Sequence, residues 1–125
     1  MRTKTKLASD QTIERLKSVL CEASRGLPGV TDRKMFGCHA LFANNNIYAL
    51  VWKTGRIGLR LPDVELFNEL MSKGGSEPWT AGNRTMAHWV LVPKIFERKA
   101  DLLSRWANAA HHLAAKAPRV PAKKK

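Results

Sequence analysis

The 125-residue sequence lacks long apolar runs and has only two cysteines. No stretch approaches the ~20 consecutive apolar residues that cross a bilayer, so we predict no membrane span. The basic N-terminus continues into Ser9-Asp10-Gln11 instead of an apolar run, and we expect no secretory signal. These features predict a cytoplasmic protein in which Cys21 and Cys38 are free thiols.

Sequence signatures of catalysis and of metal or cofactor binding are also missing. There is no HExxH, CxxC, GxSxG, phosphate-binding loop or dinucleotide fingerprint. His111 and His112 are neighbours on a predicted helix and therefore do not share a face. Glu65 and Glu69 lie four residues apart, which is typical of a solvated helix surface. We expect a protein without metal or cofactor that is not an enzyme.

The adjacent Cys38 and His39 are the one pair that suggests a reactive nucleophile. A nearby imidazole can lower the pKa of a thiol and so activate it. However, consecutive residues of a strand point to opposite faces of the sheet, so these two side chains should diverge. A buried thiol beside a surface or edge histidine is favoured, and a thiol enzyme at Cys38 is the least favoured functional hypothesis.

Positive charge dominates, with 22 basic and 10 acidic residues and a formal net charge of +12. Eight of the 22 basic residues lie at the two ends of the chain, whereas every acidic residue lies between Asp10 and Asp101. Basic tails attract polyanions without reading their sequence. Nucleic-acid binding is therefore a hypothesis that needs support from the middle of the chain.

Hydrophobic periodicity predicts three helices and five or six strands. Spacing of three and four residues, as in Ile13, Leu16 and Leu20, indicates helices, and alternation indicates strands. Asn44-Asn45-Asn46 and Lys53-Thr54-Gly55 suit tight hairpin turns, and Pro93 ends the last strand. The predicted elements are a helix at 9–25, strands at 38–43, 47–52 and 57–61, a helix at 62–71, β structure at 79–92 and a helix at 96–115.

This order predicts an α+β class, with helices covering the apolar face of an antiparallel sheet, because short hairpins can join only antiparallel strands. In the strand at 57–61, alternation places Ile57, Leu59 and Leu61 on a buried face. The other face of that strand should then be exposed to solvent. The predicted domain spans 9–116, between a flexible basic segment at 1–8 and a disordered basic tail at 117–125.

Several short motifs, taken together, resemble the TfoX N-terminal domain family, also called TfoX/Sxy. The motifs are Leu27-Pro28-Gly29-Val30-Thr31, Arg33-Lys34-Met35-Phe36-Gly37, Met86 to Pro93 with Trp89, and Leu102-Leu103-Ser104-Arg105-Trp106. The resemblance covers nearly all of residues 10 to 115 and implies a two-layer domain with a curved antiparallel sheet. It also implies a regulatory role in transcription or competence.

Two features depart from the family pattern. Many relatives continue Met-Phe-Gly with a second glycine, whereas this chain has Cys38. The regulator that names the family carries a second, C-terminal domain, and the present chain resembles only the N-terminal half. The resemblance therefore implies a fold more firmly than a function.

A basic stripe with one aromatic residue is the candidate nucleic-acid surface. Its residues are Arg33, Lys34, Lys53, Arg56, Arg60 and Trp52. The alternative for these charges is an ordinary solvated sheet face. For Trp52 the alternative is core packing, which the alternation from Tyr48 through Leu50 favours. Trp89 and Trp106 are expected in the core.

The first functional hypothesis is a non-enzymatic interaction or regulatory domain that acts through a protein partner. The second is direct nucleic-acid binding through the basic sheet face and tails. The oligomeric state stays open between a monomer and a homodimer. An unpaired sheet edge or a leftover apolar stripe on the last helix would support a homodimer, but the sequence does not say which surfaces are exposed.

Overall fold

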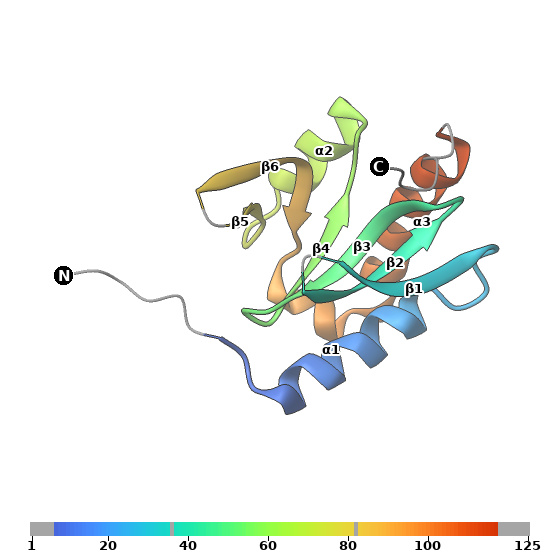
Figure 1. Cartoon of the computed structure of the whole chain (residues 1–125). Coiled ribbons are helices and arrows are strands. Elements are labelled where there is room, and N and C mark those ends of the chain that lie inside the picture. Colours follow the sequence, from blue (N-terminus) through green and yellow to red (C-terminus); the bar gives the residue numbers. More distant parts are fainter. Residues whose placement is uncertain (1–6, 36, 82, 118–125) are drawn as a thin grey trace.

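The computed structural model describes residues 7–35, 37–81 and 83–117. Phe36 of the predicted Met-Phe-Gly motif, and most of the predicted basic ends, lie outside the described residues. The chain forms a curved sheet with helices packed against it (Figure 1). The helices are α1 (Asp10–Ala23), α2 (Val64–Met71) and α3 (Ala100–Lys116), and a 3-10 turn, η1 (Lys94–Arg98), precedes α3.

Six strands form one antiparallel sheet in the order β1-β2-β3-β4-β6-β5. They are β1 (Val30–Met35), β2 (Cys38–Ala43), β3 (Asn46–Trp52), β4 (Arg56–Arg60), β5 (Glu77–Ala81) and β6 (Arg84–Leu91). The α+β prediction is confirmed, and the open count of strands before α2 resolves to four. Within the described ranges, no helix is long and apolar enough to cross a membrane.

Local sequence explains where these elements begin and turn. Ser9 caps α1, because its hydroxyl oxygen accepts a hydrogen bond from the Thr12 amide at 3.1 Å. Asp63 caps α2 in the same way through the Leu66 amide. Asn44 and Asn45 have φ values of 52° and 66°, which asparagine tolerates better than most residues. The predicted hairpin between β2 and β3 is therefore present.

The main core lies between the helices and one face of the sheet. α3 packs on β2, β3 and β4, and α1 packs on β3 and β4. Leu16 and Leu20 of α1 and Leu103 of α3 are fully buried there, and Trp106 is also part of this core. A hydrogen bond of 2.7 Å between the hydroxyls of Tyr48 and Ser24 satisfies the one polar tip of a fully buried tyrosine.

The opposite face of the sheet carries a second apolar core, which corrects the prediction of a solvated face. Its buried residues are Cys38, Ala40, Phe42, Leu50, Trp52, Trp79, Trp89 and Leu91. Pairing places Gly58 between Leu50 and Leu91 in one row across β3, β4 and β6. A Cβ atom on Gly58 would lie 3.3 Å from a Leu50 methyl carbon, so glycine allows this close approach.

Three tryptophans form the centre of the second core. The Trp79 ring packs edge-on against Trp52 and Trp89, with centroid separations of 5.0 and 4.9 Å. Trp79 comes from β5 and Trp89 from β6, whereas Trp52 ends β3. The β5–β6 hairpin and β3 are therefore joined by aromatic contacts as well as through the sheet. These tryptophans cover the face of β4 that points away from the helices, which would otherwise be exposed to solvent.

Candidate functional site

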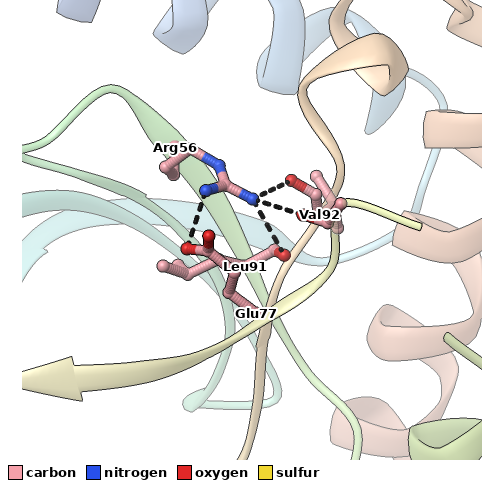
Figure 2. Close-up of polar contacts among 5 residues, drawn as sticks. Arg56, Glu77, Leu91 and Val92 are labelled. Carbon is pink, nitrogen blue, oxygen red and sulfur yellow. Dashed lines mark hydrogen bonds and ion pairs between the residues drawn. The ribbon is translucent and has the colours of Figure 1, made fainter. Parts of the chain in front are cut away.

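Arg56, one of the predicted nucleic-acid contacts, is held inside the structure (Figure 2). Its Nη1 bonds the Glu77 carboxylate at 2.9 Å. Its Nη2 donates to the carbonyl oxygens of Gly75 at 2.8 Å and Val92 at 2.9 Å, and to that of Leu91 at 3.4 Å. The side chain is only 13% exposed. Arg56 therefore joins β4 to the chain entering β5 and leaving β6, and most of its side chain is shielded from solvent.

Trp52, the predicted stacking residue, is only 8% exposed and has Trp79 against its ring. The Lys53 ammonium lies 5.2 Å from the ring centroid of Trp52. A nucleic-acid base needs an open aromatic face for stacking. The core alternative for Trp52 is the one that the structure shows.

The remaining predicted cations are distributed over different surfaces. Arg33 and Lys34 are consecutive in β1 and point to opposite faces. The Arg33 guanidinium lies 4.0 Å from the Phe42 ring centroid and donates to Asn45 at 3.0 Å. Arg60 is half-buried opposite Trp89. These cations and Arg56 do not form one continuous stripe, although Arg33, Lys34 and Lys53 are exposed.

Lys34 and Lys53 line a cavity with a third lysine, Lys17, which is not among the predicted nucleic-acid contacts. Lys17 of α1, Lys34 of β1 and Lys53 of the β3–β4 turn line a cavity of about 190 Å³, together with His39 of β2. The sequence shows Lys17 only as one polar residue on an amphipathic helix. We call this cavity, with Lys17, Lys34, Lys53 and His39 on its walls, the lysine pocket. It joins residues 36 positions apart in the sequence.

His39 forms one wall of the lysine pocket and is partly buried. Its Nε2 is shielded from solvent and has no hydrogen-bond partner among the described residues. Burial lowers the pKa of the His39 imidazole from its ordinary value of 6.5, and the Lys17 ammonium lowers it further. The carboxylates of Asp32 and Glu14 act in the opposite direction on the pKa. Burial and the Lys17 ammonium therefore favour the neutral imidazole over the charged one.

We expect His39→Gln to retain more stability than the wild type as the pH falls from about 7 to about 5. A base whose folded pKa lies below its unfolded value stabilises the fold above the unfolded value. This contribution, present above pH 6.5, is lost as the pH falls through the folded pKa. Urea unfolding at several pH values measures it, with His112→Gln, at an exposed position of α3, as the matched control. Identical pH profiles for His39→Gln and the wild type would contradict the expectation.

Cys38 belongs to the second core and also lines the cavity of the lysine pocket, next to His39 and to Ile13 and Lys17 of α1. Burial raises the pKa of the Cys38 thiol, and the Lys53 backbone amide and ammonium only partly oppose this. A neutral buried thiol is a poor nucleophile. The geometry therefore favours the alternative in which Cys38 is a packing residue.

The other histidine with a defined contact is also part of the framework. His111 on α3 is buried, its Nε2 lies 2.7 Å from the Pro28 carbonyl oxygen, and its ring packs edge-on against Tyr48. These contacts hold α3 against the loop that precedes β1. Across the described parts of the chain, no group of three His, Cys, Asp or Glu side chains is placed to hold a metal ion.

The outer side of β1 is an open edge of the sheet among the described residues. No described strand lies beyond β1 (Figure 1). All residues from Thr31 to Met35 are exposed. A cavity of about 440 Å³ runs alongside it, lined by α1, β1 and β2. Its lining residues are Cys21, Ser24, Val30, Thr31, Asp32 and Leu41. At the opposite edge, β5 carries Pro78, which cannot donate a backbone hydrogen bond.

A family model described as the TfoX N-terminal domain matches residues 22–114. This range begins near the end of α1 and runs to the last turns of α3, so it includes all six strands. No curated protein matches the chain.

Proposed function

The chain belongs to the TfoX N-terminal domain family, and from this premise we propose that it is a non-enzymatic interaction domain in regulation of the transcription or competence type. The arrangement of reactive groups supports the non-enzymatic part. Cys38, Arg56 and His111 have packing or framework contacts. The partner is a protein that supplies an extended segment.

The observation that carries this proposal is the edge of β1, beyond which the described residues place no other strand. An exposed strand edge presents a row of N–H and C=O groups that an extended peptide can pair with, while side-chain pockets supply specificity. β1 has both features, because the cavity beside Val30 and Asp32 continues the surface of the edge. The three consecutive charges Asp32, Arg33 and Lys34 discourage indiscriminate pairing and select a partner of matching pattern.

We expect proline on β1 to weaken capture of the partner by about tenfold, because losing one or two backbone hydrogen bonds has roughly that effect. Neighbouring residues of an edge strand alternate between N–H groups facing the sheet and facing outward. We therefore propose testing Thr31→Pro and Asp32→Pro in parallel and using the variant that keeps the wild-type melting temperature. The measurement is quantitative affinity capture from a lysate of the source organism.

Hydrogen exchange on the captured complex provides the control. The amides of β1 should become protected when the partner binds, whereas those of β5 at the other sheet edge should not change. Capture that is equally strong with both proline variants, together with unprotected β1 amides, would show that the partner binds elsewhere.

A second proposal is direct nucleic-acid binding, which the clustering of Lys17, Lys34 and Lys53 at one end of the sheet favours. It no longer includes Trp52 or Arg56, whose side chains are inside the structure. Fluorescence anisotropy with duplex and single-stranded DNA across a salt series tests it, since phosphate contacts make affinity salt-dependent. Absence of binding at low salt would remove this function.

A further inference from the structure

The lysine pocket concentrates positive charge that the described residues leave largely uncompensated. Glu14 is the one carboxylate that lines it, and Glu14 pairs with Lys17 at 3.2 Å. That ion pair is partly exposed to solvent, so the attraction between its two charges is weak. Among the described residues, Lys34 and Lys53 have no carboxylate within ion-pair distance. The pocket therefore has a clear excess of cations.

Three separate elements bring these cations together. Lys17 comes from α1, Lys34 from β1 and Lys53 from the turn after β3. Like charges that face one cavity repel each other, and an anion between them converts that repulsion into attraction. Because helix, strand and turn are packed into one core, the lysine stems start from fixed positions around the cavity. This distinguishes the lysine pocket from isolated lysines on a single surface helix.

The volume of the cavity limits the size of the ligand that can bind in it. Its volume of about 190 Å³ is well above the ~30 Å³ that one water molecule occupies in the liquid. It is below the ~300–1,000 Å³ of pockets that enclose whole drug-sized ligands. A compact tetrahedral oxyanion fits these bounds, with any larger group attached to it remaining outside. A phosphate group carries roughly −1.5 to −2 charge at pH 7, which suits three ammonium groups better than a carboxylate does.

We propose that the lysine pocket binds a phosphate group, with Lys17, Lys34 and Lys53 as its cationic contacts and His39 as a wall of the site. Lysine contacts phosphate as a point charge, so the site needs proximity rather than a planar, bidentate arrangement. The phosphate site is independent of the function proposed for the β1 edge. Binding of inorganic phosphate can be measured without the protein partner, so the two proposals can fail separately.

Thermal unfolding of the full chain in phosphate, with sodium chloride adjusted to constant ionic strength, is the first experiment. The melting temperature of the wild type should rise with phosphate concentration, because a ligand that binds only the folded state stabilises it. Lys34→Gln and Lys53→Gln should each weaken phosphate affinity by about tenfold or more, since each removes a charged hydrogen-bond donor.

Lys116→Gln is the matched control. Lys116 ends α3, where Asn44 of the β2–β3 turn donates to the carbonyl oxygens of Ala115 and Ala117. This is the opposite end of the β2–β3 hairpin from the lysine pocket, whose residues start β2 and follow β3. The control should keep the full wild-type response to phosphate. An equal response in all variants, or no response beyond that of chloride, would overturn the proposal.

NMR of the His39 ring gives a readout independent of variant stability. Sulfate stays a dianion over the range in which imidazole titrates, so it separates protonation of the protein from that of the ligand. A dianion beside His39 favours the charged imidazole, and sulfate should therefore raise the pKa of His39. The charged groups around His39 are Lys17 and Glu14 of α1, Asp32 of β1, Lys34, which is the register partner of His39 in β1, and Lys53, which lines the same cavity. A pKa of His39 that does not change at saturating sulfate would count against the site.

Oligonucleotides identify the source of the phosphate group. A single-stranded oligonucleotide with a 5′-phosphate is compared with the same oligonucleotide carrying a 5′-hydroxyl, on the wild type and on Lys34→Gln. Tighter binding of the phosphorylated strand that disappears in Lys34→Gln supports the site and assigns it to nucleic-acid ends. Equal binding of both strands, with the phosphate response intact, supports the site and assigns it to free phosphate or small phosphorylated molecules.

Discussion

Trp79→Ala is expected to lower the free energy of unfolding by about 3–5 kcal/mol, the usual range for truncating a buried tryptophan. Trp79 is fully buried and its ring lies between Trp52 and Trp89. Its removal leaves a cavity that its neighbours, held on β3 and β6, cannot easily fill. It also removes both edge-on aromatic contacts, each worth about 0.5–1.5 kcal/mol.

Urea unfolding followed by circular dichroism measures this effect. Trp79→Phe should lower the free energy of unfolding clearly less than Trp79→Ala does, because phenylalanine keeps an aromatic ring and leaves a smaller cavity. Ile95→Ala, at a side chain that is 56% exposed, is the control and should change stability by at most about 0.5 kcal/mol. A loss below about 1 kcal/mol for Trp79→Ala would mean that the second core contributes little to folding.

Arg56→Met is expected to lower the free energy of unfolding by about 1–3 kcal/mol, the usual cost of leaving a buried hydrogen-bond acceptor without its donor. The substitution removes the donors to the carbonyl oxygens of the buried residues Leu91 and Val92. The other two acceptors, the Gly75 carbonyl oxygen and the Glu77 carboxylate, belong to exposed residues and can be hydrated instead. Buried acceptors without donors incur their full desolvation cost. The stability of Arg56→Lys should lie between those of the wild type and Arg56→Met, because a lysine ammonium can reach only some of the acceptors that Arg56 contacts.

The matched control is Arg25→Met, which breaks the pair with Glu22 on α1, where both side chains are largely exposed. It should cost at most about 1 kcal/mol. The comparison also tests the placement of Arg56 against the earlier nucleic-acid hypothesis. Wild-type stability in Arg56→Met, combined with weaker nucleic-acid binding, would show that Arg56 contacts phosphate instead of the framework.

Local patterns in the sequence predicted the elements that depend on neighbouring residues. The strand at 38–43 coincides with β2, and the turn at Asn44 and Asn45 has the left-handed backbone that its composition indicated. The helix predicted at 9–25 extends over Asp10–Ala23, with Ser9 as its cap. These features are set by periodicity of two or 3.6 residues, by capping and by φ preference, which all act within a few positions.

The residues of the candidate site could not be predicted from such local patterns. Alternation in β4 correctly placed Ile57 and Leu59 in the main core, yet Gly58 on the other face is buried as well. Whether that second face is wet depends on curvature and on where Trp79 and Trp89 lie relative to β3. The sequence pattern around Arg56 is therefore that of a solvated stripe, and only its partners in β5 and at the end of β6 show that the side chain is mostly buried.

The sequence by itself determined the α+β class, the family resemblance and the hairpins, because those are encoded in short-range patterns and characteristic motifs. The tertiary structure decided which charges are free to bind a ligand. It placed Arg56 among backbone carbonyls and brought Lys17, Lys34 and Lys53 to one cavity. The physical reason is that a contact across helix, strand and turn depends on how distant elements pack, and no periodicity within one segment records that packing.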